Sequence, residues 1–288
     1  MERRNWRDFK LYAITAANYH PGRGLPEVME QAILGGADIV QLRAKDASKE
    51  ELLRDARALR ELTARYGVPF IVNDHLDVAL EVGADGAHFG QDDMPLAEAR
   101  RLLGPDAIIG ISTHSLEQAL AAERGGADYI GVGPVFPTGT KPGRAAVTTA
   151  YVREAAANVS IPWVAIGGIT LANADEVLAA GATRICAVSA IVGDARPADV
   201  CRAFRARIDA AAERAAEISA PAAIAVVVNG RREETAARTV AELVEALGLA
   251  GKSLVVELNG VIVAREAWET ASLADGAALE LVHFVGGG

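Results

Sequence analysis

Cysteine, long apolar runs and an excess of basic charge are all lacking in this chain, and each absence excludes a class of protein. The two cysteines, Cys186 and Cys201, have no metal-ligand spacing and suggest no disulfide framework, so we expect both to be small buried residues. No apolar stretch predicts a membrane span or a signal peptide, so we expect a cytoplasmic protein. The net charge of −9 and the pI near 5.2 argue against nonspecific binding of nucleic acid.

A repeated tripeptide organises the first two thirds of the 288 residues. Gly-Ala-Asp occurs at 36–38, 83–85 and 126–128, and Gly-Ala-Thr at 181–183 is a variant. Each copy follows a helix-like segment and precedes a short apolar run, as expected where a glycine ends a helix and a strand begins. The intervals leave room for two βα units apiece. Eight strands are therefore predicted, near 11–15, 38–43, 69–73, 85–89, 107–111, 128–132, 162–166 and 184–188.

Strictly alternating strands and helices, with near-continuous apolar strands, predict a parallel sheet in an α/β fold. Eight such units in roughly 210 residues fit a (β/α)₈ TIM barrel. A doubly wound open sheet is the alternative, but it would need no such even repeat. We therefore predict a TIM barrel over residues 1–217.

The sequence pattern changes after the barrel. Pro221 interrupts a helical stretch rich in alanine and arginine, so we predict a linker over 218–223. Residues 224–288 predict a small α+β domain of the β-grasp type, which ends in Gly-Gly-Gly. Its expected elements are a strand at 224–228, an Asn-Gly turn at 229–230, an amphipathic helix at 240–247, strands at 254–258 and 279–285, and a second Asn-Gly at 259–260.

Polar residues follow nearly every predicted barrel strand, at the rim where barrel enzymes build their sites. Gln41, Arg43 and Lys45 alternate along one strand end, so their side chains point the same way and can receive a phosphate-bearing ligand. Further polar residues follow the other strands: Asn73 and Asp74, the Gly-Gln-Asp-Asp segment at 90–93, Ser112, and the Pro-Thr-Gly-Thr-Lys segment at 137–141.

Asp74 and Asp93 follow adjacent strands, where two carboxylates can share Mg²⁺ and leave its other positions to water and phosphate oxygens. Either aspartate alone would more often cap a helix. Beside the cations Arg43 and Lys45, the pair favours a metal site.

A second anion site is expected after the last two predicted strands. Gly167-Gly168 and Val188-Ser189 stand there, where barrels bind phosphate through backbone N–H groups and a helix N-terminus. Two anion sites, one of them assisted by metal, indicate that two phosphorylated substrates are joined with loss of pyrophosphate.

Residues 9–208 resemble the thiamine-phosphate synthase family. The resemblance implies a transferase that couples hydroxymethylpyrimidine diphosphate to a carboxylated thiazole phosphate. It also implies a dissociative reaction, in which pyrophosphate leaves first and the thiazole nitrogen captures a pyrimidine methyl cation. The motifs that carry it are QLRAK (41–45), ND (73–74), GQDD (90–93), GIST (110–113), PTGTK (137–141), IGGI (166–169) and VSA (188–190).

The same resemblance implies roles for individual residues. Asp74 and Asp93 would bind Mg²⁺. The catalytic residues would be Arg43, Lys45, Ser112 and Lys141. The pyrimidine diphosphate would be held by Gln41, Arg43, Lys45, Asn73, Ser112 and Lys141. The thiazole phosphate would be held by Thr138, Gly139, Thr140, Gly167, Gly168, Val188 and Ser189.

Two features keep alternatives open. The first strand of the family usually ends Ile-Thr-Asp, whereas this chain has Ala16 at the acidic position. The related thiazole tautomerase uses a histidine after its fifth strand, about where His114 stands, so a tautomerase-like barrel is the alternative. The full set of cations and aspartates favours the synthase.

Residues 223–288 resemble the thiamine sulfur-carrier protein, a ubiquitin-like β-grasp domain. The resemblance implies that the Gly287-Gly288 terminus enters an adenylating enzyme and that the Gly288 carboxylate becomes a thiocarboxylate. Its partners would be that enzyme, a sulfur donor and thiazole synthase. A molybdopterin-type carrier and a domain that only docks partners are the alternatives. The matching segments are 228–230, 240–244, 259–265, 275–276 and 281–288.

Overall fold

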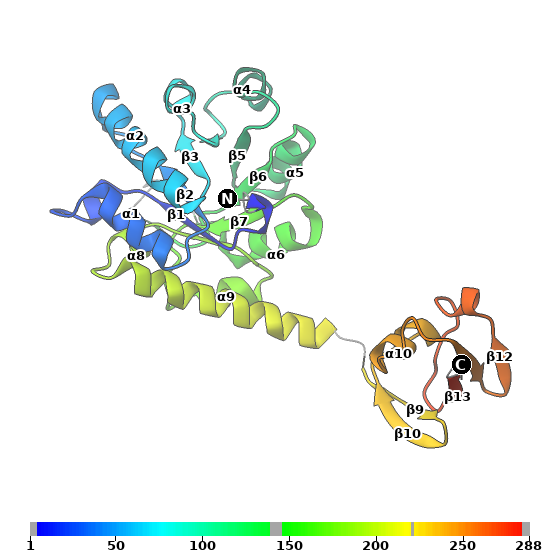
Figure 1. Ribbon diagram of the computed structural model, residues 1–288. Coiled ribbons are helices and arrows are strands. Elements are labelled where there is room, and N and C mark those ends of the chain that lie inside the picture. The colour runs from blue at the N-terminus through cyan, green and yellow to red at the C-terminus, as the bar shows by residue number, and fades with distance from the viewer. Residues whose placement is uncertain (1–4, 139–145, 220–221, 284–288) are drawn as a thin grey trace. The chain divides into compact units, whose positions relative to one another are not determined.

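The computed structural model describes residues 5–138, 146–219 and 222–283. The chain divides into two compact units, Met1–Arg214 and Ala215–Gly288 (Figure 1). Helix α9, Pro197–Ser219, continues past this division, and the next strand begins at Ile224. The domain and linker limits inferred from the sequence stay predictions. None of the helices in these described ranges is long and apolar enough to cross a membrane.

The first unit is a closed barrel of parallel strands in chain order, which confirms the predicted fold class (Figure 1). All but one of the strands lie within the segments predicted from the sequence, and β5 runs on to Thr113. The strands are β1 Leu11–Ile14, β2 Ile39–Leu42, β3 Phe70–Asn73, β4 Gly86–Phe89, β5 Ile108–Thr113, β6 Tyr129–Val132, β7 Trp163–Ile166 and β8 Ile185–Ala187.

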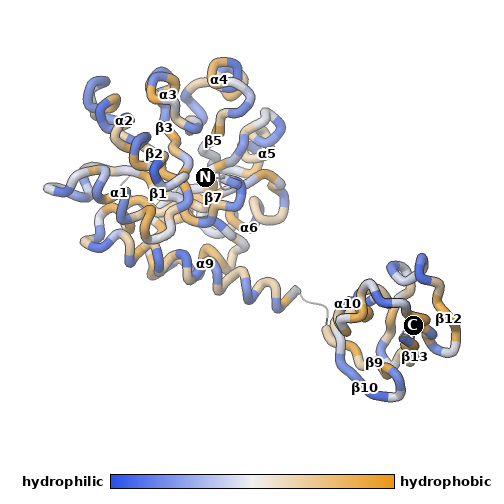
Figure 2. The backbone as a smooth tube through the Cα atoms, viewed as in Figure 1, coloured by the Kyte–Doolittle hydropathy of each residue, from blue (hydrophilic) through white to orange (hydrophobic). Residues whose placement is uncertain are grey.

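Helices alternate with the strands around the barrel. Hydrophobic colour is concentrated in the strands, and helix α2 shows much polar colour (Figure 2). Both cysteines are buried and unpaired, as expected. The helices are α1 Leu25–Leu34, α2 Lys49–Tyr66, α3 Leu76–Val82, α4 Leu96–Leu103, α5 Leu116–Arg124, α6 Thr148–Asn158, α7 Ala174–Ala179, α8 Ser189–Val192 and α9; η1 Trp6–Asp8 and η2 Ala17–Tyr19 are short 3₁₀ turns.

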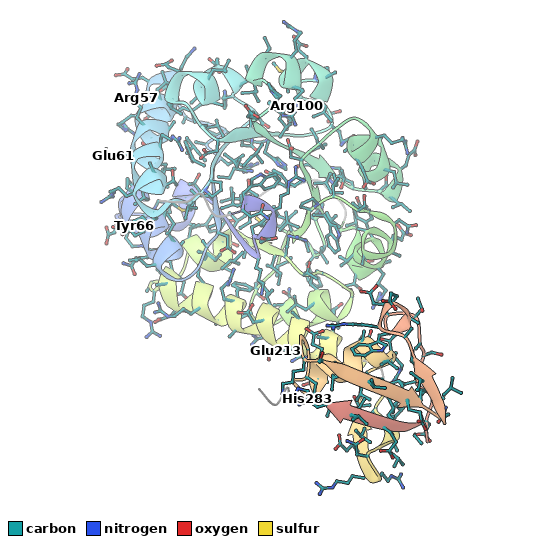
Figure 3. The ribbon with its side chains drawn as sticks, turned by 45° about the vertical axis from the view of Figure 1, so that its right-hand side comes forward. Arg57, Glu61, Tyr66, Arg100, Glu213 and His283 are labelled. Carbon is teal, nitrogen blue, oxygen red and sulfur yellow. The ribbon has the colours of Figure 1, made fainter. Side chains whose placement is uncertain are left out.

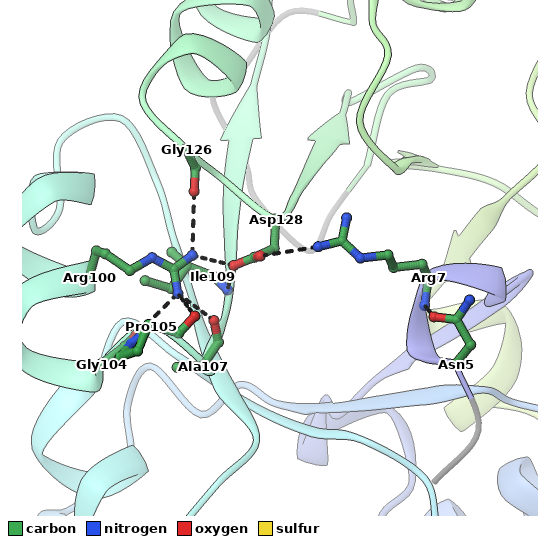
Figure 4. Close-up of polar contacts among 9 residues, drawn as sticks. All are labelled: Asn5, Arg7, Arg100, Gly104, Pro105, Ala107, Ile109, Gly126 and Asp128. Atoms are coloured by element: carbon green, nitrogen blue, oxygen red, sulfur yellow. Dashed lines mark hydrogen bonds and ion pairs between the residues drawn. The ribbon is translucent and has the colours of Figure 1, made fainter.

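The aspartate of each Gly-Ala-Asp repeat joins two neighbouring strands at the end of the barrel opposite the rim. Asp128, at the start of β6, accepts a hydrogen bond from the N–H of Ile109 at 2.8 Å and pairs with Arg100 (Figure 4). The other copies do the same: Asp85 accepts from Phe70 N–H and pairs with Arg60, and Asp38 accepts from Lys10 and Leu11 N–H and pairs with Arg205.

The second unit is a mixed sheet in the order β10-β9-β13-β11-β12, with parallel central strands β13 and β9. Its hydrophobic core includes Val226, Leu243, Val256 and Leu279. Helix α10 contributes Leu243, and the arrangement confirms the predicted β-grasp class. The elements are β9 Ile224–Val228, β10 Arg231–Thr235, α10 Val240–Ala246, β11 Leu254–Leu258, β12 Val261–Val263, η3 Arg265–Ala267 and β13 Ala278–His283.

Candidate functional site

A cavity of about 800 Å³, part of it open to solvent, lies at the carboxyl ends of the barrel strands. It brings together most of the predicted site residues, from segments far apart in the sequence. The predicted residues in its wall are Gln41, Arg43, Asn73, Ser112, Thr138, Gly167, Gly168, Val188 and Ser189.

Three predicted residues do not line this cavity. Lys45 and Asp93 are exposed, and Asp74 is half-buried beside the cavity residue Arg43. Gly139, Thr140 and Lys141 lie outside the described residues.

Arg43 is fixed at the end of β2 by a buried threonine that sequence reasoning did not single out. The Oγ1 of Thr15 accepts from the Arg43 N–H at 2.8 Å and donates to the Arg43 carbonyl at 3.2 Å. Burial lowers the pKa of Arg43, and the carboxylates of Asp74 and Asp46 oppose that shift. The guanidinium nevertheless stays charged at neutral pH.

The side chain of Arg43 is suited to an anionic ligand. Its buried Nε has no hydrogen-bond partner among the described residues. A buried donor on a charged group is costly unless it is paired, and carboxylate and phosphate oxygens match the planar guanidinium best. Arg43 therefore offers a donor for an anionic ligand at this side of the cavity.

Two glycines allow the loop after β7 to pack against the loop after β6. Gly167 and Gly168 have φ values of 101° and 64°, and a Cβ on Gly167 would lie 2.4 Å from the Cα of Pro134. Backbone hydrogen bonds join the two loops: Val135 N–H donates to Ile166, and Phe136 N–H donates to Gly167. This packing brings Thr138 and Gly168 to the same cavity wall.

A chain of hydrogen-bonded side chains crosses the barrel beneath the cavity. Gln41 Nε2 donates to Tyr12 Oη at 2.9 Å, and Tyr12 Oη lies 2.8 Å from Tyr129 Oη. Tyr129 Oη lies 2.9 Å from His88 Nδ1, and His88 Nε2 lies 2.8 Å from Ser112 Oγ. Burial raises the pKa of both tyrosines, so their hydroxyls stay protonated at neutral pH.

Sequence reasoning found the two ends of this chain and missed its middle. Gln41 and Ser112 were candidate ligands, whereas Tyr12, His88 and Tyr129 were treated as ordinary strand residues. These three residues lie in strands that are otherwise apolar. This pattern could have indicated a buried hydrogen-bond network, since a buried polar side chain in a strand requires a partner.

The structure shows the surroundings of Ala16 and His114, the two residues that left alternative functions open. Ala16 is buried in the hydrophobic core, so no carboxylate stands at that part of the rim. His114 lines the cavity, and its Nδ1 is hydrogen-bonded to the carbonyl of Gly133. The described contacts of His114 are compatible with a role in the structure of the loop after β5.

Asp74 and Asp93, the two acidic residues predicted to bind metal at the rim, both lie among the described residues. Within residues 5–138, 146–219 and 222–283, no group of three or more His, Cys, Asp or Glu side chains could hold a metal ion. Asp93 Oδ2 accepts a hydrogen bond from Gly90 N–H at 2.6 Å, which orients its carboxylate. Two carboxylates fit Mg²⁺, because Mg²⁺ keeps several waters and is usually completed by phosphate oxygens.

Comparison with known families identifies the barrel. Residues 11–191 match the family model described as thiamine monophosphate synthase. The chain belongs to the thiamine monophosphate synthase family. Residues 226–288 match the ThiS family, so the synthase barrel is joined to a sulfur-carrier domain. The protein is thus a bifunctional thiamine-biosynthesis protein whose barrel is a transferase.

Similar proteins support the same assignment for the barrel. The thiamine-phosphate synthase of Halalkalibacterium halodurans is 58% identical over 199 residues, which cover 69% of this chain and 94% of that protein. The thiamine-phosphate synthase of Chloroflexus aurantiacus is 50% identical over 209 residues, covering 72% and 96%. The structure of thiamine phosphate pyrophosphorylase from Pyrococcus furiosus matches with a TM-score of 0.65 and 38% identity, covering 72% of this chain and 98% of that one.

Proposed function

We propose that the barrel joins hydroxymethylpyrimidine diphosphate to a carboxylated thiazole phosphate and releases thiamine phosphate, pyrophosphate and carbon dioxide. The observation that carries the proposal is a single cavity with features for two anions. Arg43 offers a buried, unpaired donor on one side, and Gly168 and Ser189 offer a glycine turn and a helix start on another.

The reaction breaks the bond between the pyrimidine methyl carbon and the diphosphate oxygen, and it forms a bond from that carbon to the thiazole nitrogen. The bond from the thiazole ring to its carboxyl group also breaks, and this group leaves as carbon dioxide while its electron pair stays in the ring. No protein nucleophile is needed. Cys186 lines the cavity, but burial raises the pKa of its thiol, so it stays protonated and unreactive. The chain's task is to hold the two substrates in line and to stabilise the charge of the departing pyrophosphate.

Arg43 would meet that charge directly, with Lys45 and Lys141 as further cations. Asp74 and Asp93 would hold Mg²⁺, which when bound neutralises diphosphate oxygens. Because the described protein ligands are few, we expect Mg²⁺ to bind tightly only together with a diphosphate.

A direct assay tests the coupling reaction. The full chain is incubated with both substrates, with and without Mg²⁺, and thiamine phosphate and pyrophosphate are measured. We expect equal amounts of the two products and a requirement for Mg²⁺. Conversion of the thiazole tautomer without the pyrimidine diphosphate, and with no pyrophosphate released, would instead support the tautomerase alternative.

Asp93→Asn tests the metal site, because asparagine can still accept from Gly90 N–H but lacks the charge. We expect kcat to fall ~10²-fold or more while the fold survives. Asp92→Asn is the matched control, since it removes the same charge one residue away, and its turnover should stay near that of the unaltered chain. Near-normal turnover by Asp93→Asn would contradict the metal assignment.

We further propose that the ThiS domain carries sulfur as a thiocarboxylate on Gly288 and delivers it for thiazole formation. The family match extends over residues 226–288, which supports this use of the Gly287-Gly288 terminus. Both glycines lie outside the described residues. The partners would be an adenylating enzyme, a sulfur donor and thiazole synthase.

Mass spectrometry tests the carrier role. After incubation with the adenylating enzyme, ATP and a sulfur donor, we expect one oxygen of the chain to be replaced by sulfur. Omission of ATP is the control and should leave the mass unchanged. No exchange in the complete reaction would favour a domain that only docks its partners.

A further inference from the structure

The hydrogen-bonded side chains beneath the cavity are tightly packed, so their positions are fixed. Tyr12 is 1% exposed and Tyr129 is fully buried. Gly110 makes room for the phenol of Tyr129, because a Cβ there would lie 2.1 Å from its Cζ. The members come from separate strands, β1, β2, β4, β5 and β6, so barrel closure holds both ends of the chain in place.

The donor role of the Gln41 amide selects one direction for the protons along this series of hydrogen bonds. Tyr12 accepts from Gln41 Nε2, so its own proton goes to its other partner, Tyr129. With that assignment Tyr129 has its own proton left for His88 Nδ1, which lies 2.9 Å from its hydroxyl oxygen. A neutral histidine that accepts at Nδ1 carries its proton on Nε2 and donates it to Ser112.

The two ends of the chain therefore face the cavity with opposite character. Gln41 uses one of its two amide N–H groups on Tyr12, which holds the nitrogen there and leaves its carbonyl oxygen to accept from a ligand. Ser112 uses a lone pair on His88 Nε2–H, which leaves its hydroxyl proton to be donated to a ligand. Both residues lie in the cavity wall.

We propose that Tyr12, Tyr129 and His88 are positioning residues that impose this direction, so that the cavity presents a carbonyl acceptor at Gln41 and a hydroxyl donor at Ser112. The inference rests on the proposed function, because an aminopyrimidine is the complementary ligand. Its amino group donates to the Gln41 carbonyl, and a ring nitrogen accepts from the Ser112 hydroxyl.

The direction of these hydrogen bonds also predicts which substrate analogue the site rejects. In the oxo analogue a carbonyl replaces the amino group, so two acceptors would face each other at Gln41. A site built to hydrogen-bond one group rejects an analogue that leaves buried polar atoms unpaired. The hydrogen bonds from Gln41 to Ser112 thus set the preference for the amino form of the pyrimidine.

The histidine tautomer tests the direction without any substrate. The full chain is labelled with ¹⁵N-histidine, and the ring of His88 is assigned by comparison with His88→Gln. We expect chemical shifts of the Nε2–H tautomer, with Nδ1 unprotonated. The Nδ1–H tautomer would overturn the proposal, because it would reverse every hydrogen bond of the chain.

Selectivity tests the consequence for substrate choice. Tyr129→Phe keeps the ring but removes the hydroxyl that links Tyr12 to His88. We expect the ratio of kcat/KM for the amino substrate to that for the oxo analogue to fall at least ~10-fold. Tyr151→Phe is the matched control, because it also removes a buried tyrosine hydroxyl, the one that contacts Thr113, and it should leave the ratio unchanged.

Each outcome has a distinct meaning. An unchanged ratio in Tyr129→Phe would overturn the proposal, while active coupling by the unaltered chain would leave the proposed function standing. If the unaltered chain failed to couple the substrates, the proposed function would fail, and the tautomer would still decide the direction. Tyr12→Phe interrupts the same chain and replaces Tyr129→Phe if that variant does not fold.

Discussion

At the scale of single residues, the cavity depends on side chains that hold other side chains. Thr15 holds the backbone of Arg43 through two hydrogen bonds, and the guanidinium can then be partly buried with a donor still available. The position of one cation at the rim is therefore decided by a buried hydroxyl directly after the neighbouring strand β1. This arrangement makes the geometry of Arg43 as important as its charge.

Arg43→Lys tests that geometry. Lysine keeps the positive charge but loses Nε and the planar set of donors that matches phosphate oxygens. We expect kcat/KM for coupling to fall by roughly 10–10³-fold, with little change in stability. Steady-state kinetics with both substrates and Mg²⁺ measure the effect.

The control for this experiment is Arg57→Lys. Arg57 lies on α2 at the outside of the barrel and pairs with Glu81 in an exposed ion pair (Figure 3). Its kinetics should match those of the unaltered chain. Equal activity of the two variants would show that charge alone suffices at position 43.

At the scale of secondary-structure elements, the repeat in the sequence marks pairs of strands. Each repeat aspartate directly precedes an even-numbered strand and accepts a backbone N–H at the start of the strand before it. An arginine from a helix completes each site. The copy at 181–183 has threonine instead of aspartate, so β8 lacks this carboxylate.

Asp128→Ala should destabilise the barrel by about 1–3 kcal/mol. The change leaves the Ile109 N–H without its acceptor and removes the carboxylate that pairs with Arg100 in a partly buried place, although Arg100 keeps its backbone carbonyl acceptors. Urea denaturation of the barrel measures the free energy of unfolding. Asp209→Ala is the control, because it removes only an exposed ion pair with Lys10, which is worth about 0–1 kcal/mol. Equal losses in both variants would contradict the role of the repeat.

Glu123 is expected to make the stability of the barrel depend on pH. At the end of α5 it accepts hydrogen bonds from Ser160 and from the N–H of Ile161, just before β7, and the bond to the Ser160 hydroxyl contributes most to lowering its pKa. A carboxyl group whose pKa is lower in the folded state adds stability above its ordinary value. That stability is lost as the pH falls through the folded pKa.

Glu123→Gln therefore should be less stable than the unaltered chain at neutral pH, and the difference should shrink as the pH falls below the ordinary carboxyl pKa. Urea denaturation over a pH series measures this. A difference that stays constant down to acid pH would show that the charge of Glu123 contributes nothing.

At the scale of the whole molecule, two units with separate hydrophobic cores share one chain. Each unit has its own sheet, and all the described residues of the cavity belong to the barrel. A tethered carrier raises the local concentration of its partners near the coupling enzyme without needing a shared site. The joined domains are thus expected to work independently.

Separate fragments test that independence. A chain of residues 1–219 should couple both substrates with kcat and KM within about twofold of the full chain, since the cavity needs nothing from the ThiS domain. A chain of residues 222–288 should fold by itself, as seen by circular dichroism, because its core is its own. A large loss of turnover in the barrel fragment would show that the ThiS domain contributes to catalysis.

Much of this architecture could be predicted from sequence, because strands, helices and turns are encoded in contiguous residues. The predicted barrel strands, the β-grasp module and the polar residues at the rim all followed from local patterns. The lengthening of β5 to Thr113 did not, since Ser112 and Thr113 look like loop residues until they pair with β6.

The sequence by itself determined the alternation of elements, the two-unit organisation and the residue types at the strand ends. Only the tertiary structure decided which side chains meet: Thr15 with Arg43, each repeat aspartate with its arginine, and Tyr12 with Tyr129 and His88. The physical reason is that these contacts join residues far apart in the chain. They depend on the closure and register of the barrel, which no local pattern contains.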